Sequence, residues 1–202
     1  MCIAGSEHMR SNLPLINTAL AVALLSACNR DPVADAGPSA SALAPAWVTH
    51  RDAAGAFEAR FPAPPTLQEI NPPRKSPQEM QLAVTNAQNA EDARLLVATK
   101  VLMTDVSNYD CDAGLTGMVQ SSLTGMGCTA GEVEPRELGG LPGRTVSFTC
   151  EKRPMRGVMR IGCDARKISE RIVTAYSMMA AYKNESWNAE EAETFLSSFM
   201  LL

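Results

Sequence analysis

A short apolar run near the amino end decides which part of this chain folds and in which compartment. Arg10 precedes the run, which covers residues 13–25, and small residues follow it. This order of positive charge, apolar stretch and small residues is typical of a cleaved export signal. The run is only about 13 residues long and contains Pro14 and Asn17, whereas a bilayer-spanning helix needs roughly 20 apolar residues. We therefore expect export and not a permanent transmembrane helix.

The end of the run fixes where the signal is cut. Leu25-Ser26-Ala27-Cys28 resembles the lipobox of bacterial lipoproteins, in which the cysteine becomes the first residue and carries the lipid. The resemblance implies that Cys28 is acylated and that residues 1–27 are removed. The alternative is a plain secreted protein, although its cleavage site would carry a small residue in place of Leu25. Residues 1–8 precede the positively charged start of the signal and do not belong to its pattern. We interpret them as an artefact of an upstream start or of cloning, so that Cys2 plays no role in the mature protein.

Composition divides the remaining chain into a tether and one domain. Residues 29–45 are rich in Ala, Ser, Pro and Gly and cannot bury apolar surface, so residues 28–45 are predicted to be a lipidated, disordered tether. Fully extended, the tether would reach about 55–60 Å. Residues 46–202 have a natural size for one domain. The net charge is -4 with 22 acidic and 18 basic residues, and no basic stripe is present, which argues against nucleic-acid partners.

Four of the six cysteines lie in the predicted domain: Cys111, Cys128, Cys150 and Cys163. An even set in an exported chain predicts two disulfides. A metal site would need cysteine pairs or histidines at ligand spacing, and the domain has neither, so we expect no metal and no cofactor.

Hydrophobic periodicity predicts an alternation of strands and two helices. Alternation of apolar and polar residues indicates strands, and apolar residues at helical spacing indicate a helix near Asp112–Met126. Asn188 followed by Glu191 resembles a capping box, which predicts the start of a C-terminal closing helix. The segment Arg94–Met103 is the most apolar strand and is predicted to lie inside the sheet. The predicted strands are 47–50 and 56–61 (a hairpin), 80–84, 94–103, 132–138, 144–150, 155–163 and 171–179.

Three motifs resemble PsbP-like domains. Residues 57–65 match the family's opening phenylalanine and proline pattern, 139–144 match its Gly-x-Pro-Gly-Arg turn, and 195–199 match its terminal Phe-Leu-x-Ser-Phe. The resemblance implies an α+β fold, with an antiparallel sheet of about six to eight strands sandwiched by helices. The four cysteines and residues 163–170 depart from the pattern. The family includes photosystem subunits, binding proteins and bacterial lipoproteins, so the fold does not carry over a function.

Strand directions predict the disulfide pairing. The ends of the Asp112–Met126 helix lie about 20 Å apart, too far for a bridge between Cys111 and Cys128 without a sharp reversal. The strands that follow run back and forth between these two ends. This places Cys128 near Cys150 and Cys111 near Cys163, and we predict those two bridges.

Little in the sequence indicates catalysis. His50 with Asp52 is the only candidate base pair for a hydrolase, and no Gly-x-Ser-x-Gly elbow accompanies it. The carboxylates Glu190, Glu191 and Glu193 are expected on the solvated face of the closing helix. The four methionines 155, 159, 178 and 179 could suggest copper(I), but alternation on strands favours core positions. We expect no catalytic residues.

The sequence therefore predicts a non-catalytic binding or assembly module, anchored in the bacterial envelope and facing the periplasm. Its predicted partners are the membrane, through the lipid, and an envelope protein. Asn29 after the anchor favours the outer membrane by resemblance to lipoprotein sorting. The alternatives are an immunity-type lipoprotein that neutralises a secreted toxin and, more remotely, a hydrolase using His50. The loops 70–78 and 164–170 are candidate partner contacts, with plain solvated connectors as the alternative.

Overall fold

The computed structural model describes residues 47–70, 78–86, 94–106 and 108–202. The predictions for the signal, Cys28, the tether and residues 71–77 lie outside these described residues. Within the described part, no helix is long and apolar enough to cross a membrane.

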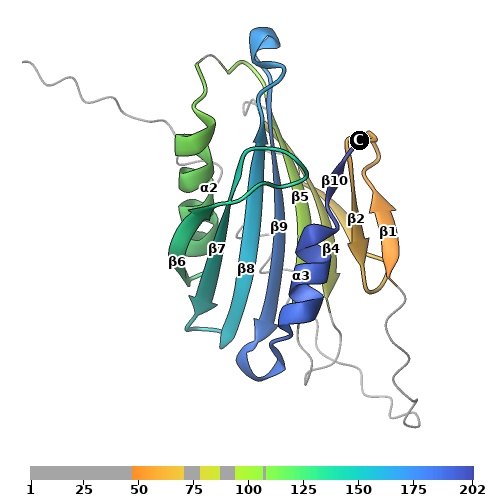
Figure 1. The fold of residues 1–202 in the computed structure, drawn as a ribbon, viewed down its shortest axis with the longest axis vertical. Coiled ribbons are helices and arrows are strands. Elements are labelled where there is room, and N and C mark those ends of the chain that lie inside the picture. Colours follow the sequence, from red (N-terminus) through yellow and green to blue (C-terminus); the bar gives the residue numbers. More distant parts are fainter. Residues whose placement is uncertain (1–46, 71–77, 87–93, 107) are drawn as a thin grey trace, which may run out of the picture.

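A seven-stranded antiparallel sheet forms the centre of the domain, with the strand order β3-β4-β5-β9-β8-β7-β6 (Figure 1). β5 pairs with β4 on one side and β9 on the other, which confirms its predicted interior position. Each turn reverses the chain, and near-continuous apolar runs bury both faces of β5 and β9. The strands are β3 (Thr66–Ile70), β4 (Gln78–Asn86), β5 (Arg94–Met103), β6 (Cys128–Pro135), β7 (Gly143–Cys150), β8 (Met155–Asp164) and β9 (Val173–Lys183).

The predicted first hairpin forms, but in a second, smaller sheet. β1 (Val48–Arg51) pairs with β2 (Phe57–Phe61), and the C-terminal β10 (Met200–Leu201) adds to the other side of β2. Gly55 in the β1–β2 turn has a φ of 66°, a conformation that glycine adopts without a steric penalty. Neither β10 nor β3 was predicted, because each is short and lacks a clear alternating pattern.

Helix α2 (Cys111–Gly125) covers one face of the large sheet, over β6, β7 and β8. Asp110 caps its first turn, and its buried side chains are Leu115, Met118, Val119, Ser122 and Leu123. Gly114 allows the ring of Tyr109 to lie against the helix, since a Cβ at Gly114 would come 2.2 Å from the tyrosine hydroxyl. Packing against the sheet and Tyr109 thus offsets the low helix propensity of this glycine.

Helix α3 (Ala189–Ser197) and the small sheet cover the opposite face. Asn188 accepts a hydrogen bond from the Glu191 amide at 3.0 Å, as the predicted cap requires, and Ala192, Phe195 and Leu196 point into the core. Two apolar clusters therefore lie on the two sides of one sheet. This arrangement confirms the predicted α+β fold of an antiparallel sheet between helices.

Several strand boundaries differ from the predictions. β6 begins at Cys128 and ends at Pro135, earlier than predicted, because its register shifts between Ala130 and Val133 and breaks the alternation that the prediction used. Leu138 instead forms an isolated bridge with Leu141. β9 continues to Lys183, beyond the predicted end at Met179, since β5 and β8 pair along its whole length.

Candidate functional site

Two disulfides lie near the two ends of helix α2, one tying the helix to β8 and the other joining β6 to β7. Cys111, the first residue of α2, is bonded to Cys163 with Cα atoms 5.9 Å apart. Cys128, just after the helix, is bonded to Cys150, which lies directly opposite it on β7. These are the pairs that the strand directions predicted.

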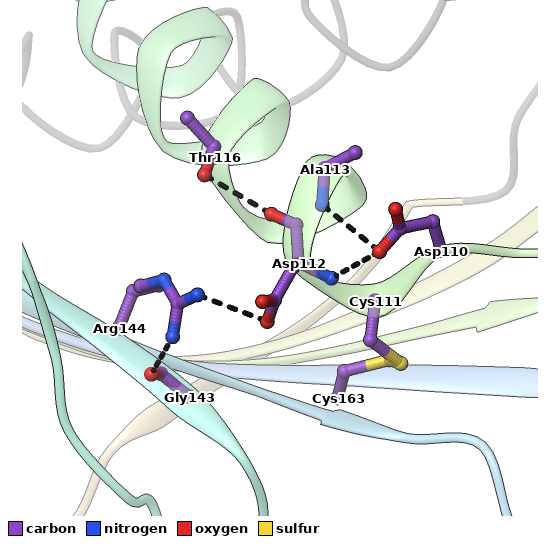
Figure 2. Close-up of polar contacts among 8 residues, drawn as sticks. All are labelled: Asp110, Cys111, Asp112, Ala113, Thr116, Gly143, Arg144 and Cys163. Carbon is purple, nitrogen blue, oxygen red and sulfur yellow. Dashed lines mark hydrogen bonds and ion pairs between the residues drawn. A yellow bond between two sulfur atoms is a disulfide. The ribbon is translucent and has the colours of Figure 1, made fainter.

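Polar contacts hold the start of α2 over the sheet (Figure 2). The Asp110 carboxylate accepts hydrogen bonds from the amides of Asp112 and Ala113 at 2.9 and 3.3 Å. The Asp112 carboxylate lies 2.9 Å from Nη2 of Arg144, whose Nη1 donates to the Gly143 carbonyl at 3.0 Å. Because these groups satisfy one another, the acidic start of α2 serves the attachment of the helix beside the Cys111–Cys163 bridge.

The candidate dyad of His50 and Asp52 lies at the first hairpin, where both residues make structural contacts. His50 lies half-buried on β1, with its ring edge-on to Phe57 and Phe61, and burial lowers its pKa more than nearby Asp52 raises it. The Asp52 carboxylate accepts from Lys100 Nζ at 3.0 Å and from the Ala56 amide at 3.3 Å. It thereby closes the β1–β2 turn and ties the small sheet to β5. The absence of enzymatic activity stays a prediction.

The expectation that the α3 carboxylates all face solvent was wrong for Glu191, whose side chain is 10% exposed, whereas Glu193 stays 53% exposed while it reaches a buried arginine. Arg94 Nη1 donates to Glu191 Oε1 at 2.5 Å, and Arg160 Nη2 donates to Glu193 Oε2 at 2.5 Å. Arg160 is buried on β8 and also donates to the Ser197 hydroxyl at 3.2 Å. The two arginines lie on the sheet face beneath α3, so helical periodicity alone could not show that these glutamates would pair with them.

Glu193 is the centre of a small charged cluster at the edge of α3. Its carboxylate also lies 3.6 Å from Arg136, in the β6–β7 connection, and accepts from the Ser197 hydroxyl at 2.6 Å. Partial burial alone would raise the pKa of Glu193, but the bonds from Ser197 and Arg160 outweigh it and lower the pKa. Arg160 alternates with Met159 and Ile161, so the strand pattern places it on the face opposite that core, and no sequence signal marked this cluster.

The methionines do not form a common site. Met159 and Met179 are buried on the α2 side of the sheet, whereas Met178 is buried on the α3 side. Met155 packs at the margin of the α2 cluster. Within the described part of the chain, no group of three or more His, Cys, Asp or Glu residues could hold a metal ion. The side chains thus occupy core positions.

The three family-like motifs meet at one junction on the α3 side. Phe57 stacks on Phe199 with ring centroids 5.5 Å apart, and Phe61 contacts Phe195 at 5.1 Å. A Cβ at Gly139 would lie 2.7 Å from the Phe199 ring, so the β6–β7 connection packs closely against it. The motifs therefore join the small sheet, α3 and this connection, which is a structural role.

The candidate loop 164–170 forms the tip of the β8–β9 hairpin. Asp164 Oδ1 accepts from the Arg166 amide at 3.0 Å and from Nε at 2.8 Å, and Oδ2 accepts from Nη2 at 2.6 Å. The hydrogen bond from the Arg166 side chain is the main reason that the pKa of Asp164 is lowered. The 3-10 turn η1 (Ile168–Glu170) follows, and residues 166–171 are all exposed.

The expectation that both sheet faces are covered is only partly met. Thr129, Ser147 and Thr149 are exposed on the α3 side of β6 and β7. The helix and the small sheet lie over β5, β8 and β9 and stop short of these two strands. Sequence patterns do not show how far a covering element reaches.

Comparisons with known proteins reveal a likeness of fold. No family model and no curated protein matches the chain. Among solved structures, LpqN, described as involved in cell envelope biogenesis of Mycobacterium tuberculosis, is 12% identical with a TM-score of 0.50, covering 77% of this chain and 90% of LpqN. The cyanobacterial PsbP (CyanoP) of Synechocystis sp. PCC 6803 is 11% identical with a TM-score of 0.48, covering 82% of this chain and 98% of CyanoP. At 12% identity, the similarity to LpqN is one of fold.

Proposed function

We propose that this chain is an exported lipoprotein of the bacterial envelope whose domain binds a partner protein and catalyses no reaction. The observation that carries the proposal is the pair of disulfides, Cys111–Cys163 and Cys128–Cys150. Such bridges persist in oxidising compartments such as the periplasm. They agree with the signal-like segment and the lipobox-like Cys28, which indicate the same destination.

The pairing of the carboxylates within the fold supports the proposal that the domain catalyses no reaction. A catalytic carboxylate or base must reach its substrate. In the described part of the chain, Asp52 is bonded to Lys100, Glu191 to Arg94 and Glu193 to Arg160. Each pair joins two elements of the fold, so each has a structural explanation that needs no substrate.

The envelope location has one further support. LpqN, which shares the fold, is described as taking part in cell envelope biogenesis. We propose that this chain also works in the envelope, attached through Cys28 to the outer membrane, with its domain in the periplasm. Its role there would be assembly or binding.

Mass spectrometry and fractionation of the native host test the proposal. The mature protein should begin at an acylated Cys28 and sediment with outer membranes, whereas Cys28→Ala should leave an uncleaved or unanchored chain. A peptide map of unreduced protein should contain both bridges. An unmodified Cys28 in an uncut chain with free thiols would contradict the proposal. His50→Ala should leave the cellular phenotype of the protein unchanged. Loss of that phenotype in the variant would instead favour an enzyme that uses His50.

A further inference from the structure

We propose that the tip of the β8–β9 hairpin, residues 164–172, is the surface by which the domain contacts its partner. The structure fits a partner protein with an apolar hollow rimmed by carboxylates. The inference rests on the proposed function as a binding module and identifies which part of the domain binds.

The hairpin tip stands apart from the rest of the domain. In Figure 1 it extends beyond the upper end of the sheet, above the start of α2, and no helix or strand covers it. β1 starts at the lower end of the small sheet in the same view. The tip therefore lies at the end of the domain opposite to the start of β1.

The tip is held in one conformation by its own backbone. The amides of Ile168, Glu170 and Arg171 donate to carbonyls within the tip at 2.9–3.0 Å, and the Ile172 amide donates to the Lys167 carbonyl at 3.1 Å. Arg171 adopts a left-handed φ of 61°, and its carbonyl accepts from the Val106 amide at 3.0 Å. A left-handed arginine is costly unless its surroundings fix it. The loop is therefore ordered before a partner arrives, which reduces the entropy lost on binding.

The side chains of the tip combine one aliphatic group with basic ones. Ile168 is 36% exposed at the end of the hairpin. Arg166 is bonded to Asp164, and Arg171 lies 3.8 Å from Asp105. Lys167 attracts Asp164 through space but makes no hydrogen bond or ion pair within the described residues. An exposed aliphatic residue beside cations complements an apolar hollow with an acidic rim.

A protein fits this tip better than a lipid surface does. Glu170 and Asp164 stand among the cations, whereas binding to anionic lipid relies on clusters of several Lys and Arg. Only one aliphatic side chain is available for insertion.

Photo-crosslinking in intact cells of the native host tests the inference. The probe is p-benzoylphenylalanine placed at position 168 of the full chain, with position 67 as the control because Leu67 is 59% exposed on β3. We expect one discrete protein adduct from position 168 that is absent from position 67. Mass spectrometry should place the crosslinked segment beside Asp or Glu residues. Lys167→Glu should lower the adduct yield about fivefold, as expected for reversing a charge at an interface rim.

Lys152→Glu is the matched control for charge, since Lys152 is exposed in the β7–β8 turn at the other end of the sheet. It should leave the adduct yield unchanged. The inference is overturned if position 168 gives no protein adduct, gives adducts to phospholipid, or gives the same adducts as position 67. It is also overturned if Lys167→Glu leaves the adduct yield unchanged, or if Lys152→Glu lowers the yield equally. Membrane fractionation of the same cells reports separately on the anchor, so an anchored chain without an adduct refutes the hairpin contact alone.

Discussion

Removing the disulfides should cost this domain most of its stability, and the cost can be worked out from their nested arrangement. The Cys111–Cys163 bridge closes 52 residues, and the Cys128–Cys150 bridge closes 22 residues inside that loop. In the loop-entropy account, loops of these lengths are worth about 4.1 and about 3.4 kcal/mol when each is the sole bridge. With the inner bridge in place, the outer loop is effectively about 30 residues long and is worth about 3.6 kcal/mol.

The two bridges should therefore make similar contributions to the free energy of unfolding. We expect Cys111→Ala with Cys163→Ala to lower the free energy of unfolding by about 3.5 kcal/mol, and Cys128→Ala with Cys150→Ala to lower it by about 3 kcal/mol. Loss of both should cost about 7 kcal/mol, compared with a total of about 5–15 kcal/mol for a typical domain. The reduced protein would then be largely unfolded in a reducing compartment.

Urea unfolding followed by tryptophan fluorescence provides the assay, because Trp47 and Trp187 both pack against the core on the α3 side. Reduced wild-type protein is the control, since it keeps the sulfur atoms and separates the lost constraint from any cavity at buried Cys163. A change below about 1 kcal/mol on removing either bridge would refute the reasoning, because it would mean that the bridged segments are already close in the unfolded chain.

Two further predictions concern buried or partly buried charges. Lys100→Met should destabilise the domain by about 3–4 kcal/mol, because it leaves the Asp52 carboxylate, 5% exposed, without its cation; adding Asp52→Asn should recover much of this loss, and urea unfolding of the single and double variants checks it. The pKa of Glu193 is lowered from its ordinary 4.5, so the carboxylate contributes stability above pH 4.5 that is lost as the pH falls through the lowered value. Glu193→Gln should remove that part of the pH dependence of stability. If the free energy of unfolding, measured between pH 7 and 3, falls as steeply in the variant as in wild type, the assignment is contradicted.

Some of the candidate site could be predicted because it depends on local pattern and strand direction. The bridges of Cys111 and Cys128 followed from counting reversals of the chain, since each antiparallel turn returns the backbone to the same end of the sheet. The loop 164–170 was recognised as a connection between two strong strands. Its ordered, projecting tip was not foreseen, because the left-handed Arg171 and the contact to Val106 depend on a segment far away in the sequence.

The charged contacts under α3 show where sequence patterns fail. Glu191 and Glu193 occupy helix positions that periodicity alone assigns to solvent. Arg94 is 97 residues from Glu191, and Arg160 is 33 residues from Glu193. No local rule connects such residues, and only the placement of α3 over β8 and β9 brings them together.

The sequence by itself determined the α+β class, the interior position of Arg94–Met103 and the order in which the strands reverse. These follow from the period of the apolar residues and from turn residues, which act over a few positions. The tertiary structure decided that the first hairpin leaves the large sheet and pairs with β10, and that α3 covers only part of one face. Those outcomes depend on how distant apolar surfaces pack together, as in the stacking of Phe57 on Phe199, and packing between distant segments leaves no periodic mark in the sequence.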